Sequence, residues 1–92
     1  MPLNTPIARC QVKIQEACGL GMRTAAQFIC TAGQFRSDVW VIHDGRRYNG
    51  KSMRELLTMI AEHGEQLELE AQGPDAEAAL AALARTVHPR HS

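Results

Sequence analysis

Two segments of the chain alternate apolar and polar residues with a period of two, the pattern of a β-strand that has one face on a core. They cover residues 9–15 and residues 66–72. The apolar members are Cys10, Val12 and Ile14 in the first segment and Leu67, Leu69 and Ala71 in the second. We expect both to be strands, and we expect Gly73-Pro74 to end the second because proline has no N–H to donate to a neighbouring strand.

A third apolar run, residues 39–43, is rich in β-branched and aromatic side chains and is followed by Asp44-Gly45. Asp-Gly between two extended segments is a strong signal for a two-residue hairpin turn. We therefore expect residues 39–43 and residues 46–49 to be antiparallel neighbours.

Three other segments place apolar residues at the i, i+3, i+4, i+7 spacing of a helix with one buried face. The first begins near Gly21 or Met22 and runs to about Ala32, with Gly33 as its stop. The expected core positions are Ala25, Phe28, Ile29 and Ala32 in this helix, Met53, Leu56, Leu57 and Ile60 in the second, and Ala76, Ala79, Leu80, Leu83 and Val87 in the third.

The second helix begins after Ser52, which can form a capping box with Glu55: the serine oxygen accepts from the glutamate N–H while the glutamate reaches back. It is expected to end at Gly64, directly after His63. The last helix opens on acidic residues, which suit the positive end of a helix dipole. These residues are Asp75 and Glu77.

The resulting order, β-α-β-β-α-β-α, predicts an α+β fold with a four-stranded antiparallel sheet that three helices cover on one face. Ninety-two residues suffice for one core and are too few for two. We expect a single domain over residues 9–87, with residues 1–8 as a flexible N-terminus and residues 88–92 as a frayed tail.

Charge and composition narrow the classes of partner. Ten basic and ten acidic residues cancel, so no global charge favours nucleic acid or an anionic membrane. No apolar run is long enough to span a bilayer and the start does not resemble a secretory signal, which favours the cytoplasm. The three cysteines, Cys10, Cys18 and Cys30, form no Cys-x-x-Cys pair, which favours a reducing compartment and gives no support for a metal site.

The first helix carries a second apolar stripe beside its core stripe. Met22, Ala26 and Cys30 follow one another at i, i+4, i+8. An exposed band of methionine and alanine would suit a docking surface, whereas a buried one would only widen the contact with the core. The pattern leaves both interpretations open.

Residues 45–52 read Gly-Arg-Arg-Tyr-Asn-Gly-Lys-Ser and match the spacing of a Walker A phosphate-binding loop. We interpret the match as coincidental, because Asp44-Gly45 predicts a turn and the next four residues a returning strand. The chain is also too short for the parallel sheet that usually carries such a loop. No nucleotide is therefore expected, and Ser52 is expected to cap the second helix.

Residues 18–28 read Cys-Gly-Leu-Gly-Met-Arg-Thr-Ala-Ala-Gln-Phe. This stretch resembles the active-site loop and first helix of HPr, the phosphocarrier family of the sugar phosphotransferase system, whose pattern is Gly-Leu-His-x-Arg-Pro-Ala-Ala. The chain keeps Gly19, Leu20, Arg23, Ala25 and Ala26. Gly21 stands where the family has its phosphorylated histidine, and Thr24 where it has proline. The resemblance covers about residues 10–87 and implies the HPr fold, an open-faced β-sandwich.

The resemblance also implies a function. Without the histidine, the chain is similar to HPr paralogues that keep the fold and act by protein contact, so we expect a non-enzymatic regulatory protein without a cofactor. Its partners would be phosphotransferase-system components or a regulatory protein. Ser52 matches the serine that is phosphorylated in some members, although Arg54 replaces the apolar residue found beside it. The anion-binding residues would be Gly21, Met22 and Arg23, and the partner-binding residues Met22, Arg23, Ala26, Gln27, Met53, Arg54 and Leu57.

Three alternatives stay open. Cys18 could replace the histidine as phosphoryl acceptor, because a helix N-terminus and Arg23 both favour a thiolate there. The chain could instead be a thiol-based sensor that uses Cys18 and Cys30, or Gly21 could be an altered histidine. The histidines that the chain does contain are expected at a strand end, at a helix end and in the tail, away from position 21. They are His43, His63, His88 and His91.

Overall fold

The computed structural model describes residues 6–14, 21–59 and 64–87. Its elements follow the predicted order. They are β1 (Ile7–Lys13), α1 (Met22–Ala32), β2 (Asp38–His43), β3 (Arg46–Asn49), α2 (Met53–Thr58), β4 (Gln66–Gln72) and α3 (Ala76–Val87).

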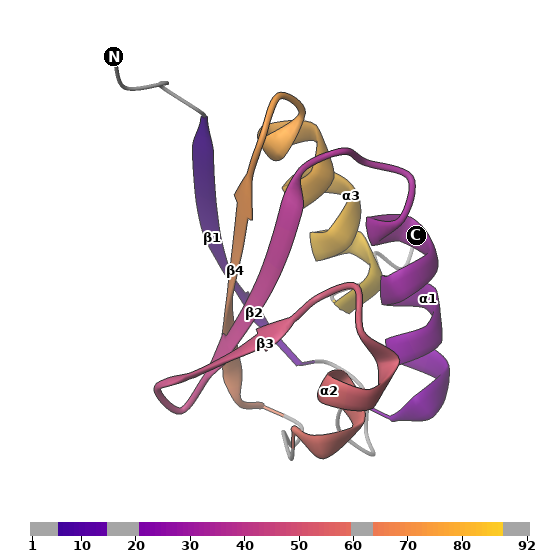
Figure 1. The fold of residues 1–92 in the computed structure, drawn as a ribbon. Coiled ribbons are helices and arrows are strands. Elements are labelled where there is room, and N and C mark those ends of the chain that lie inside the picture. The colour runs from indigo at the N-terminus through magenta and orange to yellow at the C-terminus, as the bar shows by residue number, and fades with distance from the viewer. Residues whose placement is uncertain (1–5, 15–20, 60–63, 88–92) are drawn as a thin grey trace, which may run out of the picture.

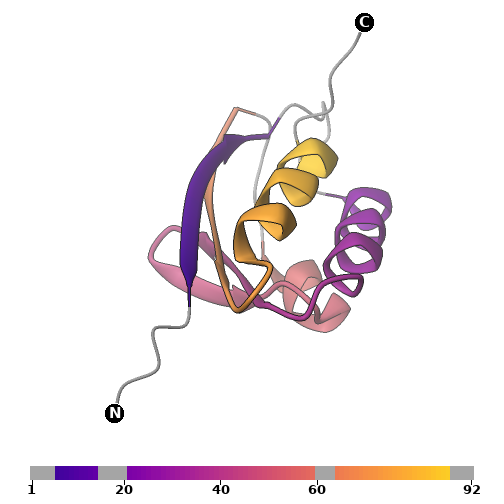
Figure 2. The ribbon, with the colours of Figure 1, turned by 90° about the horizontal axis from the view of Figure 1, so that it is seen from above.

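The four strands form one antiparallel sheet in the order β1-β4-β2-β3. All three helices lie on one face of this sheet and leave the other face open (Figure 1, Figure 2). The predicted α+β fold, with a four-stranded antiparallel sheet and helices on one side, is therefore confirmed. The chain places β1 beside β4, which begins more than fifty residues later, so the sheet depends on long-range pairing.

The core lies between the sheet and the helices. The strand residues predicted to be apolar and inward-facing are buried or, for Cys10, half-buried. In α3 all five predicted core residues are buried, and in α1 the stripe is buried except for Ile29, which is half-buried and packs against the core. Alternation in the strands and helical spacing in α1 and α3 thus identify the core correctly.

The predicted start of the first strand is two residues too late. β1 begins at Ile7, which pairs with Gln72, and the pairing with β4 continues to Lys13. The side chain of Ile7 is 52% exposed, so this end of the strand carries no alternation signal. Backbone pairing, which does not depend on side-chain burial, extends the strand beyond the pattern.

The second helix is shorter than expected. α2 ends at Thr58, and Met59 has extended backbone angles (φ −78°, ψ 123°). Leaving the helix there lets the Met59 side chain reach the core, where it is only 3% exposed, whereas Leu57 is 44% exposed. The predicted core position of Leu57 and the predicted continuation of the helix are therefore wrong, and Ile60 and His63 lie outside the described residues.

The predicted hairpin is confirmed. β2 and β3 are antiparallel neighbours, with His43 facing Arg46. The two turn residues both have positive φ, 53° at Asp44 and 81° at Gly45. Positive φ at both central positions is the geometry of the type I′ turn that Asp-Gly favours.

The segment between α1 and β2 is fastened to the start of α3 by Asp75. Its carboxylate accepts from the Ser37 hydroxyl at 2.6 Å, from the Ser37 N–H at 3.0 Å and from the Arg36 N–H at 3.0 Å. These bonds, with that of Ser37 first, lower the pKa of Asp75. The sequence suggested Asp75 only as a charge that complements the helix dipole. It did not indicate that Asp75 also binds the segment before β2.

Candidate functional site

The N-terminal end of α1 carries no side chain at its cap. Gly21 is the N-cap residue (φ −90°, ψ −177°), and its carbonyl accepts the first helical hydrogen bond from the Ala25 N–H at 2.9 Å. Met22 and Arg23 follow and are exposed, and the first turn contains no acidic residue. Residues 18–20, which include Cys18, lie outside the described part of the chain.

Position 21 has room for a side chain. A Cβ built on Gly21 would meet no described atom within 4 Å, and the backbone angles are in the extended region that any residue adopts. Neither crowding among the described residues nor backbone geometry therefore requires glycine here.

The second stripe of α1 faces solvent. Met22 is 69% exposed, Cys30 is exposed and Ala26 is half-buried, in contrast to the buried core stripe of the same helix. The interpretation that this stripe widens the core contact is therefore excluded for Met22 and Cys30. A large apolar side chain that is two-thirds exposed is the usual mark of a contact surface when others lie nearby.

α2 packs against α1, next to which it lies in the fold (Figure 1). It contributes further exposed side chains. Leu57 and Arg54 are exposed, and Met53 is half-buried against the core. Gln27 of α1 is exposed as well. We call the predicted partner-binding residues of the two helices the α1–α2 surface: Met22, Arg23, Ala26, Gln27, Met53, Arg54 and Leu57.

Ser52 caps α2 as predicted. Its side-chain oxygen accepts from the Glu55 N–H at 3.2 Å. The predicted reciprocal bond, from the Ser52 N–H to the Glu55 carboxylate, is wrong. The Glu55 carboxylate instead accepts from the Asn49 N–H at 2.8 Å. The Ser52 N–H already donates to the Asn49 carbonyl at 3.1 Å, so Glu55 is free to tie the helix to the end of β3.

The segment that matches a Walker A pattern has a structural role throughout. Residues 46–49 form β3, and the Lys51 ammonium donates to the Phe35 carbonyl at 2.9 Å. Gly50 lies against the core, where an added Cβ would come within 2.5 Å of a Val39 methyl. The spacing of the glycines and the lysine therefore reflects a hairpin, a close packing contact and a loop anchor, and no phosphate-binding loop is formed.

The described histidine and cysteines do not converge on position 21. His43 ends β2, with Nε2 at 2.7 Å from Glu65 Oε1. Cys30 is exposed on α1, whereas Cys10 is half-buried in β1, where burial raises the pKa of its thiol. The other histidines and Cys18 lie outside the described residues, and within the described residues no three His, Cys, Asp or Glu side chains gather as a metal site would require.

A charged cluster that the sequence pattern did not indicate lies on the open face of the sheet. The Glu70 side chain is only 8% exposed and bonds Arg47 of β3, with 3.1 Å between Nη2 and Oε2, and Arg9 of β1, with 3.1 Å between Nε and Oε1. Arg47 also lies over the Trp40 ring at 5.0 Å from its centre. The bonds from Arg47 and Arg9 hold the pKa of Glu70 below its usual range. Alternation marks position 70 as outward-facing, but only strand order shows which charges meet there.

No helix within the described ranges is long and apolar enough to cross a membrane.

Comparison with known proteins identifies the family. Residues 8–88 match the family model described as PTS HPr component phosphorylation site. The phosphocarrier protein HPr of Neisseria meningitidis is 40% identical over 72 residues, which cover 78% of this chain and 81% of that protein. The HPr-like protein Crh of Bacillus subtilis is 38% identical over 77 residues, which cover 84% and 91%. The crystal structure of HPr from Bacillus anthracis superposes with a TM-score of 0.84 at 32% identity, covering 89% of this chain and 98% of that chain. The fold and these similarities together show that the chain belongs to the HPr family of the phosphotransferase system.

Proposed function

We propose that this HPr-family protein does not carry phosphate on a histidine and acts by regulatory contact with other proteins through the α1–α2 surface. The observation that carries the proposal is Gly21 at the N-cap of α1, directly before the exposed residues Met22 and Arg23. As a member of this family the chain is a carrier or regulatory protein and not an enzyme.

The chemistry at position 21 supports this reading. Phosphoryl relay through this family's usual residue needs an imidazole, whose phosphoryl adduct is labile enough to be passed on. Glycine offers no acceptor atom. The helix N-terminus with Arg23 still presents N–H groups and a positive charge, which can hold an anionic group of a partner in place of a phosphohistidine.

The composition of the α1–α2 surface indicates which kind of partner surface would bind it. Two exposed apolar side chains, Met22 and Leu57, lie on helices that pack together, and the charged members of the set, Arg23 and Arg54, are both positive. A partner patch with an apolar centre and an acidic rim would complement it. Components of the phosphotransferase system, or a regulatory protein, would provide such a patch.

Ser52 is a second part of the proposal. A phosphate on this half-buried cap residue would meet the free N–H groups of the first turn of α2, and Arg54 and Lys51 are close in sequence. The Glu55 carboxylate is engaged by the Asn49 N–H, which draws that negative charge away from the cap. Phosphorylation at Ser52 would convert the positive α1–α2 surface into one of mixed charge and so change its choice of partner.

Phosphoryl transfer tests the first part. The protein is incubated with the general phosphotransferase enzyme and phosphoenolpyruvate, and its intact mass is read. We expect no gain for the native chain and a gain of one phosphate for Gly21→His, which should fold because a side chain fits at position 21. A gain in the native chain would contradict the proposal, and its loss in Cys18→Ser would assign the carrier role to that thiol.

A second incubation, with an HPr-type kinase and ATP, tests Ser52. A gain of one phosphate that disappears in Ser52→Ala is the expected result. No gain, or a gain that persists in Ser52→Ala, would remove regulatory phosphorylation at Ser52 from the proposal and leave unmodified contact as the mode of action.

Contact through the α1–α2 surface is tested by titrating the same phosphotransferase enzyme and following its binding by calorimetry. Met22→Asp should weaken binding at least about tenfold, which corresponds to about 1.4 kcal/mol. Ile7→Asp is the matched control, since Ile7 is also a large exposed apolar residue but lies on β1. Equal losses for both variants would argue against a specific role of the α1–α2 surface.

A further inference from the structure

α1 and α3 lie side by side on the helical face of the sheet (Figure 2). A cavity between them has a volume of about 510 Å³, within the range of about 300–1,000 Å³ that is usual for small-molecule sites. The described residues that line it are Ala26, Gln27, Cys30 and Thr31 of α1 and Arg85 and Thr86 of α3. The cavity therefore brings a nucleophilic thiol together with groups that can bind a polar ligand.

The charge in this cavity is positive. Arg85 is exposed, and within the described residues no carboxylate forms an ion pair with it. None of the described lining residues is acidic. The Thr86 hydroxyl donates to the Leu83 carbonyl at 2.8 Å, so its oxygen can still accept from a ligand. A ligand with a carboxylate for Arg85 and an amide or ammonium group for Thr86 would fit these side chains.

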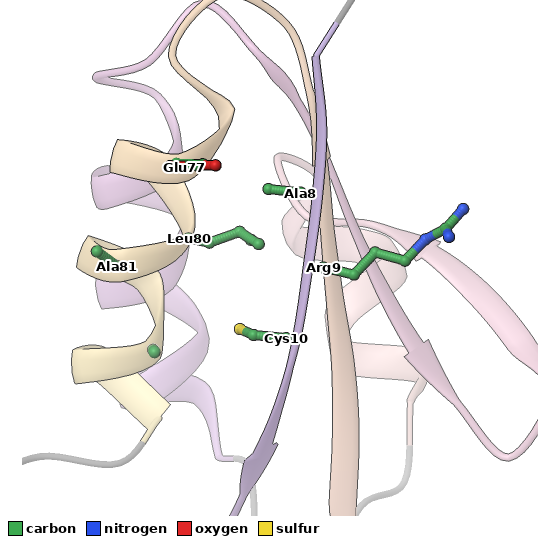
Figure 3. A pocket seen from close by; sticks show the side chains of 7 residues that line it. Ala8, Arg9, Cys10, Glu77, Leu80 and Ala81 are labelled. Atoms are coloured by element: carbon green, nitrogen blue, oxygen red, sulfur yellow. The ribbon is translucent and has the colours of Figure 1, made fainter.

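The other described cysteine lies in a cavity of different character. Cys10 lines a groove of about 480 Å³ between β1 and α3, where Glu77 extends towards the thiol side of β1 and the Arg9 side chain extends away from it (Figure 3). Cys10 is half-buried, and burial raises the pKa of its thiol, which lowers the fraction of nucleophilic thiolate. An anionic reagent would therefore meet a negative charge and a less reactive thiol there. The two thiols should differ in which reagents they accept.

We propose that Cys30 and Arg85 form a site of reversible S-thiolation by a small carboxylate-bearing disulfide, of which glutathione disulfide is the example. Arg85 binds a carboxylate of the disulfide, and the Cys30 sulfur attacks one of its two sulfur atoms. The S–S bond of the reagent breaks as a new S–S bond forms to Cys30. The departing thiolate takes up the proton that Cys30 releases. One disulfide replaces another, so no further oxidant is required, and an excess of free thiol reverses the step.

The modification would act on the proposed contact surface. Ala26 and Gln27 line the cavity and also belong to the α1–α2 surface, and Cys30 follows Met22 and Ala26 on the second stripe of α1. A bound anionic group would cover part of that stripe and offset its positive charge, so it should weaken contact with an acidic partner patch. This consequence rests on the proposed function, whereas the thiolation site does not.

Rates of thiol–disulfide exchange test the site. In the parent variant Cys10→Ser/Cys18→Ser only Cys30 remains, and its reactions with anionic glutathione disulfide, cationic cystamine and neutral 2-hydroxyethyl disulfide are followed by intact mass. Adding Arg85→Gln should lower the ratio of the glutathione disulfide rate to the cystamine rate by about threefold to tenfold. Comparing this ratio between two variants cancels the intrinsic reactivities of the reagents. The neutral disulfide reports any change in the thiol itself.

Arg46→Gln in the same parent is the matched control. It removes the same charge from an exposed arginine of β3 that does not line the cavity, so the ratio should stay unchanged. Added salt should bring the ratio in the parent towards that in Arg85→Gln. Arg85 also lies in the last turn of α3, where its charge suits the helix dipole, but that role alone would not make Cys30 select reagents by charge.

The variant Cys18→Ser/Cys30→Ser, which keeps Cys10, should react more slowly with glutathione disulfide than the parent does. A faster reaction at Cys10 would overturn the proposal. An equal ratio in the parent and in Arg85→Gln, or an equal fall in Arg46→Gln, would overturn it as well, because the selectivity would then not come from the cavity.

Calorimetry tests the consequence for binding. The parent carrying glutathione on Cys30 should bind the general phosphotransferase enzyme at least about threefold more weakly than the unmodified parent, and dithiothreitol should restore the affinity. Unchanged affinity after thiolation would overturn the regulatory consequence while the contact itself stands. An unmodified chain that does not bind would overturn the proposed contact, and this consequence with it, but not the thiolation site.

Discussion

At the residue scale, Gly21 and Gly50 differ in how much space a side chain would have. A Cβ on Gly50 would lie 2.5 Å from Val39 Cγ1 and 3.1 Å from Phe28 Cε1, whereas a Cβ on Gly21 would meet no described atom within 4 Å. Gly50 is therefore required by packing, and Gly21 is not. The sequence shows a glycine in both places and cannot distinguish them, because the neighbours of Gly50 lie on α1 and β2.

Substitution by alanine should separate the two positions. Gly50→Ala should lower the free energy of unfolding by about 1–3 kcal/mol, because the new methyl overpacks the core. Gly21→Ala should stay within about 0.5 kcal/mol of the native chain, since lower entropy of the unfolded chain offsets a poorer cap. Urea unfolding followed by circular dichroism measures both. Equal effects of the two substitutions would contradict the packing argument.

The cap of α2 gives a second prediction at this scale. Ser52→Ala removes the oxygen that accepts from the Glu55 N–H and should lower the free energy of unfolding by about 1 kcal/mol. Ser52→Asp keeps an acceptor and should retain most of the stability. Thermal unfolding of the three proteins checks this, and an alanine variant as stable as the native chain would show that the cap bond contributes little.

At the scale of elements, Glu70 joins three strands of the sheet. It lies on β4 and binds Arg9 of β1 and Arg47 of β3. β3 is not adjacent to β4, so this long arginine reaches across β2, where it covers Trp40. The cluster therefore ties both edge strands to the middle of the sheet.

This cluster should make stability depend on pH. The pKa of Glu70 is lowered in the folded state, chiefly by Arg47, so its contribution is fully present above the unfolded-state value of about 4.3 and is lost as pH falls through the folded value. Glu70→Gln should lower the free energy of unfolding by about 1–2 kcal/mol near neutral pH, and the difference should shrink on acidification. Urea unfolding at several pH values measures it. Glu68→Gln, on the same strand, is the control and should show a smaller difference; an equal one would contradict the assignment.

The ends of α2 show where helical spacing misleads. Met53, Leu56 and Ile60 continue the period of a helix, yet the chain leaves the helix at Met59 and buries that side chain in the core. At its start, the Glu55 carboxylate binds Asn49 instead of Ser52. In both cases the side chain makes a contact outside the helix in place of the one that helical spacing predicts. The local sequence pattern contains no information about these contacts, because they depend on how the helix packs against the rest of the fold.

At the scale of the whole molecule, the α1–α2 surface lies apart from β1. Helices α1 and α2 are on the helical side of the sheet, and α1 and β1 lie on opposite sides of the molecule (Figure 1). We expect Met22→Asp on α1 to weaken binding of the phosphotransferase enzyme, and Ile7→Asp on β1 to leave that binding unchanged. The calorimetric titration described above checks this, and a loss of affinity in Ile7→Asp would show that binding is sensitive to changes far from the α1–α2 surface.

The order of elements, the four strands and the helical face of the sheet were predictable from the sequence, because alternation, helical spacing and the Asp-Gly turn are local consequences of which side chains must be buried. Apolar spacing likewise placed the start of the first helix near Gly21 or Met22, and the Ser-x-x-Glu pattern placed Ser52 at the start of the second; the structure has Gly21 and Ser52 as the two N-cap residues. The lack of a phosphoryl acceptor at position 21 could also be predicted, because the sequence itself shows that Gly21 has no side chain.

Tertiary structure alone decided which residues meet. It placed β1 at an edge beside β4, brought Arg9 and Arg47 to Glu70, set Asp75 against Ser37 and exposed Leu57 while burying Met59. The physical reason is the same in each case. Periodicity reports which face of an element is apolar, whereas strand order and helix docking depend on the sum of contacts between distant segments, and only the folded chain reveals that sum.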